Sequence, residues 1–303
     1  MTQPPFWQPA LGRPQLWRTL LGLVLTGVVF ALVAIGLIVA AVKFFGLTRL
    51  QMAEADTPGA AMMMFLPFLG FHIGLALVLP LLHKRRYRSL FGPSLRLNLR
   101  HFAYGVAMIG VLGGASLIVT GLEQLLYPGA PEITQVRPLA GWLAWLPVFA
   151  ALVLMQSLAE ELVFRGYLLG QLRARFRSLW ICAVLPSALF GMLHFDANVW
   201  DVNAYMYVLN TTVVGVIACM VTLRTGNLGA AAGLHFANNM MALLLGVKGN
   251  LAGATLFAVD ATPQSGYITW SFAVATGLSV LLFALWWRWM NRQHVIANPP
   301  AGA

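Results

Sequence analysis

A series of long, uninterrupted apolar stretches limits what this chain can fold into. The core of a bilayer holds no water, so a segment that crosses it must satisfy its backbone groups within a helix or a closed barrel. Continuous apolar runs of about 20 residues, without the alternation of barrel strands, indicate helices. The stretches cover residues 20–41, 62–82, 102–126, 142–172, 179–195, 204–223, 228–247 and 268–290. The sequence therefore predicts an all-α integral membrane protein with about eight transmembrane helices.

The composition agrees with a membrane protein over the whole chain. Only 9% of the residues are charged and 59% are hydrophobic, whereas about a quarter of the residues of a soluble domain are charged. Both cysteines fall inside apolar stretches and are expected to pack as small hydrophobic side chains. We divide the chain into three N-terminal helices at 1–141, a core of four helices at 142–247 and a last helix with a cytoplasmic tail at 248–303.

The charged residues of the loops separate onto the two sides of the membrane. With an even number of spans, the loops on one side carry the basic clusters at 13–18, 84–100 and 173–177 and no Asp or Glu. The loops on the other side carry every acidic residue except Glu160 and Glu161. By the positive-inside rule both termini are cytoplasmic, and this explains the net charge of +10 without a nucleic-acid partner. From the short loops we expect the bacterial inner membrane.

Two adjacent glutamates lie inside the fourth stretch. A carboxylate near the middle of a bilayer costs at least about 2.5–3.5 kcal/mol on insertion scales, so such a pair indicates a functional site. Glu161 and Arg165 are four residues apart and share a helical face, which predicts an ion pair. Glu160 points about 100° away and is free to accept a proton. The alternative is a structural ion pair that holds two helices together.

Two histidines and an asparagine follow in later stretches. His194 ends the fifth stretch, where the ring of Phe190, one turn earlier, can hold it in place. His235 and Asn239 are four residues apart, so the imidazole and the amide face one cavity. A lone histidine at the end of a span is more often an interfacial or structural residue. The other pair can equally be a polar contact between helices.

The depth of these groups in the membrane decides whether they can meet. At about 1.5 Å of rise per residue, Glu160, His194 and His235 lie at similar distances from the basic side. This convergence requires the fourth helix to continue to Arg173. If the helix ends near Arg165 instead, Glu160 is shallower and the groups do not meet.

A carboxylate, two imidazoles and an amide in one cavity suit the activation of a water molecule. Glu160 would take a proton from a water that His194 holds or polarises. His235 and Asn239 would donate hydrogen bonds to the oxyanion of a tetrahedral intermediate. Alternatively, Glu160, His194 and His235 would bind Zn²⁺. Neither an HExxH motif nor a cysteine ligand set supports that reading.

In their order, these motifs resemble those of the CPBP intramembrane proteases. That family includes the CAAX prenyl endopeptidases and the bacterial abortive-infection and bacteriocin-immunity proteins. The motifs read Glu160-Glu161-x-x-x-Arg165, Phe190-x-x-x-His194 and His235-x-x-x-Asn239. The run 224–228 also resembles the family's approach to the last motif. The resemblance covers about residues 142–245, and the flanking stretches match only in being hydrophobic.

The resemblance implies an intramembrane endopeptidase that cuts a peptide bond near the membrane, as a CAAX-type protease does. Glu160 would be its base. The residues that bind the water and the oxyanion would be His194, His235 and Asn239. The supporting residues would be Glu161, Arg165 and Phe190. The family is often labelled metalloprotease, but asparagine is a poor zinc ligand, so we expect no cofactor and keep Zn²⁺ as the alternative.

Two other classes of function stay open. A proton-coupled transporter also uses Glu and His inside its spans, but the first three stretches here hold no matching polar set. A non-catalytic immunity or binding protein would keep the motifs for structure alone. The expected partners are membrane lipid and a peptide or membrane-anchored protein substrate, either prenylated or unmodified.

Overall fold

The computed structural model describes residues 4–127, 129–249 and 251–297. In this part of the chain, six helical segments are long and apolar enough to cross a membrane. They are Leu16–Phe45, Pro58–His83, Leu99–Leu126, Leu139–Arg175, Asn203–Thr225 and Gly266–Trp289. A shorter apolar helix covers Trp180–Met192. The chain is an all-α, multi-pass membrane protein, as the sequence predicts.

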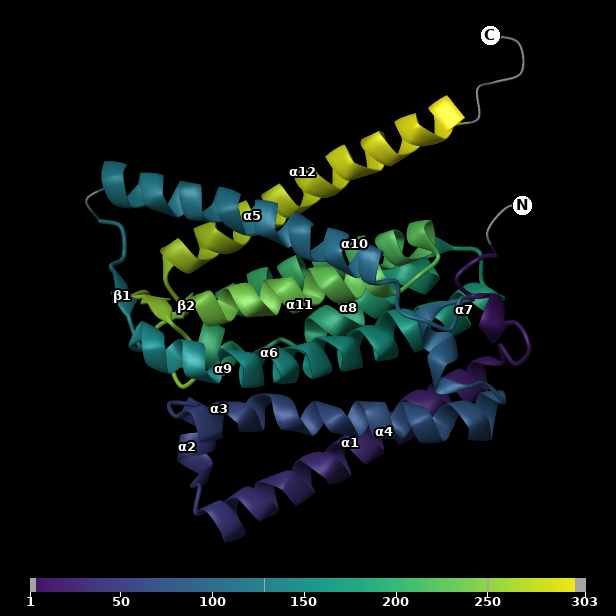
Figure 1. The fold of residues 1–303 in the computed structure, drawn as a ribbon, viewed down its shortest axis with the longest axis horizontal. Helices are drawn as coiled ribbons and strands as arrows, with labels where there is room; N and C mark the ends of the chain where they lie inside the picture. Colours follow the sequence, from purple (N-terminus) through teal and green to yellow (C-terminus); the bar gives the residue numbers. More distant parts are fainter. Residues whose placement is uncertain (1–3, 128, 250, 298–303) are drawn as a thin grey trace.

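All eight predicted stretches are helical, but two of them are shorter than a full span. Stretch 179–195 yields the short helix Trp180–Met192. Stretch 228–247 yields α11 (Gly229–Leu244), whose chain then enters a strand. Both helices run through the middle of the molecule (Figure 1). Most of α11 is covered by protein and so does not have to match the thickness of the lipid. The helix Trp180–Met192 buries one face only and exposes the apolar side chains of Trp180, Leu185 and Met192.

The remaining elements connect and subdivide these helical segments. The apolar helical segments, in chain order, comprise α1 (Leu16–Phe45), α3 (Pro58–Phe65), η2 (Leu66–Phe68), α4 (Leu69–Val78), η3 (Leu79–His83), α5 (Leu99–Leu126), α6 (Leu139–Glu161), η5 (Leu162–Leu169), α7 (Gly170–Arg175), η6 (Trp180–Val184), α8 (Leu185–Met192), α10 (Asn203–Thr225), α11 and α12 (Gly266–Ala297). Short helices in the connections are η1 (Gln8–Ala10), α2 (Arg49–Glu54), η4 (Tyr87–Phe91) and α9 (Ala197–Trp200). Of the η segments, η3, η5 and η6 are π-helices and the others are 3₁₀-helices.

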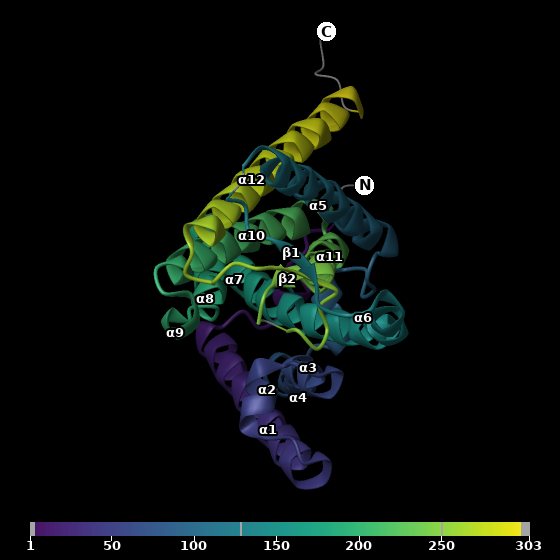
Figure 2. The same cartoon turned by 90° about the vertical axis from the view of Figure 1, so that its left-hand side faces the viewer.

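The helices form three layers. Figures 1 and 2 show α1 and α4 on one side and α5 with α12 on the other, while α6, α8, α10 and α11 lie between them. α1 packs on α4, α11 packs on α5, and α10 packs on both α8 and α12. The middle layer carries all of the motifs found in the sequence, so the candidate site is enclosed by protein on both sides.

A small sheet closes one end of the molecule. Its strands β1 (Ile133–Gln135), β3 (Phe257–Val259) and β2 (Leu245–Val247) lie in that order. β1 runs antiparallel to β3, whereas β2 runs parallel to it. The sheet joins the connection between α5 and α6 to the connection between α11 and α12, and the sequence analysis did not foresee it.

The basic ends of the helices meet at the opposite end, near α7 (Figure 1). Arg18 donates a hydrogen bond to the carbonyl of Leu82 at 2.9 Å. Arg85 donates to Oε1 of Gln171 at 3.2 Å. These contacts tie the basic segments around residues 18, 85 and 171 together, in agreement with their predicted placement on one side of the membrane.

A buried polar cluster at this end fixes the long fourth helix to α1 and η3; we call its members His83, Tyr167 and Gln171 the anchor cluster. Nε2 of His83 lies 2.8 Å from the Tyr167 hydroxyl, and Nδ1 lies 3.1 Å from the carbonyl oxygen of Arg13. The Tyr167 hydroxyl also donates to the carbonyl of Thr19 at 3.2 Å, and Gln171 Nε2 contacts the His83 ring.

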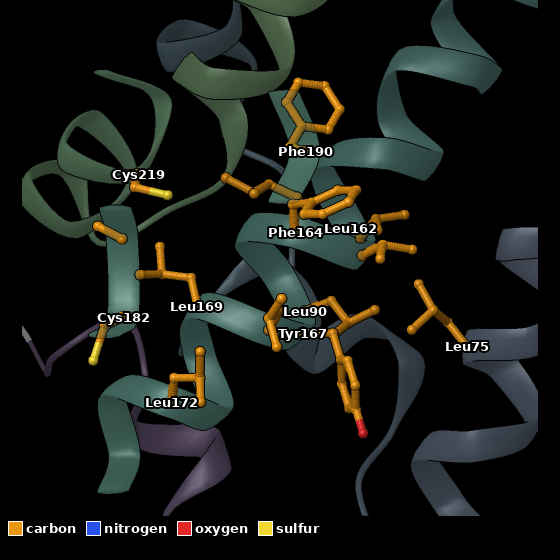
Figure 3. Close-up of a cluster of buried hydrophobic side chains, with 14 of the residues drawn as sticks. Leu75, Leu90, Leu162, Phe164, Tyr167, Leu169, Leu172, Cys182, Phe190 and Cys219 are labelled. Carbon is orange, nitrogen blue, oxygen red and sulfur yellow. The ribbon is translucent and has the colours of Figure 1, made fainter. Parts of the chain in front are cut away.

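The largest hydrophobic cluster surrounds the π-helix η5. All eight residues of this segment are buried. Figure 3 shows that Phe164 lies toward Phe190, with ring centroids 4.8 Å apart, whereas Tyr167 points to the other side. Cys182 and Cys219 are free and buried, which confirms their predicted role as small apolar side chains.

The packing of α11 on α5 depends on glycines. A Cβ atom added at Gly233 would lie 2.1 Å from the carbonyl oxygen of Phe102, and one added at Gly105 would lie 2.2 Å from that of Ala230. Both distances are far below van der Waals contact, so only glycine fits at these two positions. The two helix backbones therefore touch directly, as small residues allow in membranes.

Candidate active site

The two glutamates lie at the end of α6, inside a helical segment that continues to Arg175. The fourth helix therefore does not end near Arg165, and Glu160 is deep in the segment. The eight residues that follow the glutamates form the π-helix η5. Sequence periodicity did not predict this segment, although π-helices frequently mark functional sites.

Glu161 and Arg165 form the ion pair expected from their spacing. Arg165 Nη1 lies 2.8 Å from Glu161 Oε1, and both side chains are almost completely buried. Cζ of Arg165 also lies over the ring of Phe190, 4.8 Å from the ring centroid. The charge pair and the aromatic ring together hold Arg165 in one position.

His235 lies between the two glutamates. Its Nδ1 is 2.9 Å from Oε1 of Glu161, and its Nε2 is 3.2 Å from Oε2 of Glu160. Carboxylate oxygens and an unprotonated ring nitrogen only accept hydrogen bonds, so the close approach to Glu160 requires a proton between these two residues. With that proton on His235, the two carboxylates balance Arg165 and His235, and the buried group is neutral.

His194 packs against Phe190, one helical turn earlier. Its Nδ1 lies 2.9 Å from the carbonyl oxygen of Phe190, and the two rings meet edge to face with centroids 4.9 Å apart. The expectation that Phe190 packs this histidine is confirmed. A carbonyl only accepts, so Nδ1 carries the proton and Nε2 of the neutral ring is the acceptor. The Phe190 ring also faces His235 at 6.1 Å.

Asn239 is held by residues that the sequence analysis missed. Its Nδ2 donates to Oε1 of Gln156 at 2.8 Å and lies 3.4 Å from the hydroxyl of Ser157. Gln156 and Ser157 are both buried. Gln156 precedes Glu160 by four residues on the same helical face, and this spacing is a signal that could have identified it.

The motif residues border one cavity of about 130 Å³. Its lining includes Glu161, Arg165, Phe190, His194, His235 and Asn239. Glu160 lies beside His235, outside this lining, with 8% of its surface accessible. The structure thus gathers the three sequence motifs around one cavity, with Glu160 at its edge. Asn238 also borders this cavity and contacts Asn239 through a long hydrogen bond of 3.4 Å.

The residues do not form a three-ligand zinc site. Glu160 and His235 are neighbours, but within the described residues no three His, Cys, Asp or Glu side chains are grouped to hold a metal ion. The chemistry considered below therefore contains no step through a bound metal.

The turn before α11 also fixes the start of that helix. Gly226 adopts φ of +65°, a left-handed conformation that favours glycine. The side chain of Asn227 is buried, accepts from the backbone N–H groups of Asn98 and Gly229, and donates to the carbonyl of Arg96 at 2.8 Å. Asn227 therefore sets where α11 begins, and with it the position of His235.

Comparison with known proteins agrees with this geometry. A relative in Bacillus subtilis (strain 168), described as "Uncharacterized protein YyaK", is 27% identical over 221 residues, which is 71% of each chain. No solved structure matches the chain. Residues 142–241, the segment that contains every motif residue described above, match the family model of the type II CAAX prenyl endopeptidase Rce1-like proteins. The resemblance found from the motifs is thereby confirmed: this segment of the chain is similar to the Rce1-like proteins.

Proposed function

We propose that the protein is an intramembrane endopeptidase that hydrolyses a peptide bond near the membrane by means of a water molecule activated by Glu160. At the level of the family, the Rce1-like match supports a CAAX-type intramembrane protease. The observation that carries the mechanism is the buried arrangement of Glu160, His235 and Glu161, in which the imidazole lies 3.2 Å and 2.9 Å from the two carboxylates.

The charge balance of this cluster assigns the role of each group. When His235 is protonated, Glu160 is an ionised base and the imidazolium is a donor, while Glu161 and Arg165 neutralise each other. A protonated His235 beside an ionised base suits catalysis because it can stabilise the negative charge that forms on the substrate carbonyl. Glu161 would hold the imidazolium through Nδ1 and leave Nε2 as the donor.

The reaction then follows as a balanced sequence. Glu160 takes one proton from a water molecule that also donates a hydrogen bond to Nε2 of His194. The water oxygen bonds to the carbonyl carbon, and the resulting oxyanion accepts hydrogen bonds from His235 and from the second N–H of Asn239. When the C–N bond breaks, the proton held by Glu160 passes to the leaving amine. The products are a carboxylic acid and an amine, which become a carboxylate and an ammonium ion when the acid proton passes to the amine.

The proposal also includes the orientation of the protein in the membrane and the membrane in which it lies. Arginines at the α7 end would face the cytoplasm under the positive-inside rule, with both termini there and the small sheet on the opposite side. The proposed location is the bacterial inner membrane. The substrate is a peptide or a membrane-anchored protein within membrane lipid. The experiment below compares prenylated with unmodified peptides to decide whether the substrate carries a prenyl group.

Peptide cleavage by the purified protein in detergent tests this proposal. Wild type and Glu160→Gln are compared on prenylated and unmodified peptides, with products identified by mass spectrometry. General-base catalysis contributes about 10²–10⁴-fold, so we expect the variant to lose at least about a hundredfold in kcat. Equal cleavage by both proteins would contradict the role of Glu160. Full activity after thorough chelation would agree with a water activated without a metal, and its loss with restoration by Zn²⁺ would contradict that part.

Glu160→Gln is a suitable variant because it preserves size and removes one charge. Glu161, Arg165 and a neutral His235 then remain as a balanced group, so the variant should fold. A thermal unfolding curve in the same detergent serves as the control. If Glu160→Gln unfolds while the wild type does not, the residue supports the structure, as a non-catalytic membrane protein would require.

A further inference from the structure

A second polar surface of the cavity is not used by the proposed chemistry. α10 contributes Tyr207 and Asn210 to the lining, one helical turn apart. The ring of Tyr207 packs edge to face against that of His194, with centroids 5.4 Å apart. It also stacks on the ring of Phe272 of α12. Asn210 therefore borders the same cavity as His194 and His235, one helical turn from Tyr207.

The hydrogen bonds around Asn210 fix the direction of its amide. Asn210 Nδ2 lies 2.7 Å from the hydroxyl of Thr276. That hydroxyl lies 2.7 Å from the carbonyl oxygen of Phe272, to which it gives its single proton. Thr276 can therefore only accept from Asn210, so the amide nitrogen must face Thr276. This network decides an orientation that the shape of the side chain alone leaves open.

Oδ1 of Asn210 is left as an unused acceptor. Among the described residues, no group donates a hydrogen bond to it, whereas Nδ2 is occupied by Thr276. The side chain is half-buried and borders the cavity. An acceptor held in a fixed direction in a mostly apolar pocket is the kind of group that orients a ligand and gives specificity.

The surroundings of Asn210 limit the chemistry of that ligand. The neighbouring walls of the cavity are apolar and come from Met108 and Leu112 of α5 and from Leu282 and Phe283 of α12. The charges of Glu161 and Arg165 neutralise each other. A neutral N–H donor fits this surface better than an ammonium group, because a buried cation would lack a counter-ion. The backbone N–H of a peptide is such a donor.

We propose that Oδ1 of Asn210 accepts a hydrogen bond from a backbone N–H of the substrate close to the scissile bond. The subsite rests on the proposed peptidase function and deepens it. Thr276 orients the acceptor, and Tyr207 forms the wall between the subsite and His194. The bond positions the peptide before reaction, so its loss raises KM more than it lowers kcat.

The test combines a variant of the protein with a change in the peptide. In a series of otherwise identical substrates, each amide within three residues of the cut is replaced in turn by an ester, which removes one N–H. Wild type and Asn210→Leu are then compared on the parent peptide and on each ester. Thr211→Val is the matched control, because Thr211 borders the same cavity beside Asn210 but has no part in the proposed bond.

We expect Asn210→Leu to raise KM about tenfold for the parent peptide, the size of one neutral hydrogen bond, and Thr211→Val to leave KM within about twofold. For one of the esters, the KM of the wild type should rise by a similar factor. The KM of Asn210→Leu should be the same for that ester as for the parent peptide. The proposal is overturned if every ester affects both proteins equally. It is also overturned if no single ester weakens the wild type, a result that does not depend on the folding of any variant.

The experiment distinguishes failure of the Asn210 subsite from failure of the proposed peptidase function. If the wild type cleaves the parent peptide and Asn210→Leu has an unchanged KM, the peptidase stands and the subsite is wrong. If the wild type cleaves no peptide that contains the sequence of a natural substrate, the peptidase is contradicted and the subsite with it. Thermal unfolding of each variant in detergent shows whether its kinetic constants refer to folded protein.

Discussion

Two buried polar clusters lie on the same long helix and differ in how their atoms are satisfied. In the anchor cluster, each side-chain polar atom of His83, Tyr167 and Gln171 has a hydrogen-bond partner. In the candidate active site, Oε2 of Glu161 and Nε of Arg165 are buried without one. Figure 3 shows Tyr167 and Phe190, a neighbour of the site, on opposite sides of η5.

The difference separates a cluster that holds helices together from one arranged for chemistry. An unmade hydrogen bond on a buried group costs about 1–3 kcal/mol, so a purely structural cluster would satisfy all of its atoms. Oε2 of Glu160, which is also without a hydrogen bond, faces His235 at ion-pair distance. A site that must bind water and a substrate carbonyl needs such uncommitted atoms. The comparison therefore predicts opposite effects of mutation on stability and on turnover.

The largest expected effect on stability belongs to Arg165→Leu. Removal of the cation leaves two buried carboxylates with only His235 to balance them, and breaking a buried ion pair costs about 3–5 kcal/mol. The measurement is the free energy of unfolding in detergent with increasing sodium dodecyl sulfate. Adding Glu161→Gln to this variant should recover part of the loss. Unchanged stability of Arg165→Leu would show that the charge balance described above is wrong.

Tyr167→Phe should affect stability but not turnover. The change keeps the ring and removes the hydroxyl, which leaves His83 and the carbonyl of Thr19 without that partner. We expect a loss of about 1–3 kcal/mol in the same unfolding measurement, with kcat per folded molecule unchanged. Tyr104→Phe is the control, because Tyr104 is 58% exposed on α5. If Tyr167→Phe lowered kcat and left stability unchanged, the anchor cluster would not be purely structural, and the distinction between the two clusters would be wrong.

Gln156→Leu should have the opposite effect, with a small change in stability and a clear loss of turnover. Without the Gln156 oxygen, the amide of Asn239 loses its 2.8 Å partner and its fixed direction. We expect kcat to fall about tenfold, which is the size of one oriented hydrogen bond, while KM changes little. Ser157→Ala, which removes only the 3.4 Å contact, should lower kcat less. Equal kinetics for wild type and Gln156→Leu would rule out this positioning role.

The sequence predicted the helices well because hydropathy is a strong local signal. It overestimated the length of two of them, because the apolar stretches 179–195 and 228–247 continue past the ends of their helices at Met192 and Leu244. The π-helix after Glu161 has no signal in residue spacing. The three-residue strands are too short for a periodic pattern, and β1 pairs with a strand more than a hundred residues away.

The candidate site was predictable where residues share a helical face. The spacing of Glu161 and Arg165 gave their ion pair, and that of Phe190 and His194 gave their ring contact. The position of His235 between both glutamates depends on how α11 docks against α6, which no local spacing encodes. The direction of the Asn210 amide likewise depends on Thr276, which lies 66 residues away in the sequence.

The glycine contact between α11 and α5 determines which wall of the cavity can move. A cavity of about 130 Å³ is smaller than the roughly 300–1,000 Å³ of ordinary ligand pockets, so a peptide enters only after the cavity widens. α11 has no room to retreat, because Gly105 and Gly233 already bring its backbone against α5. α12 forms hydrogen bonds with its neighbours through Thr269, Trp270 and Thr276. Its later turns pack on α5, α10 and α11 through Phe283 and Trp286. A substrate of the proposed reaction would therefore need movement in the other walls of the cavity, such as those that α10 and α12 contribute.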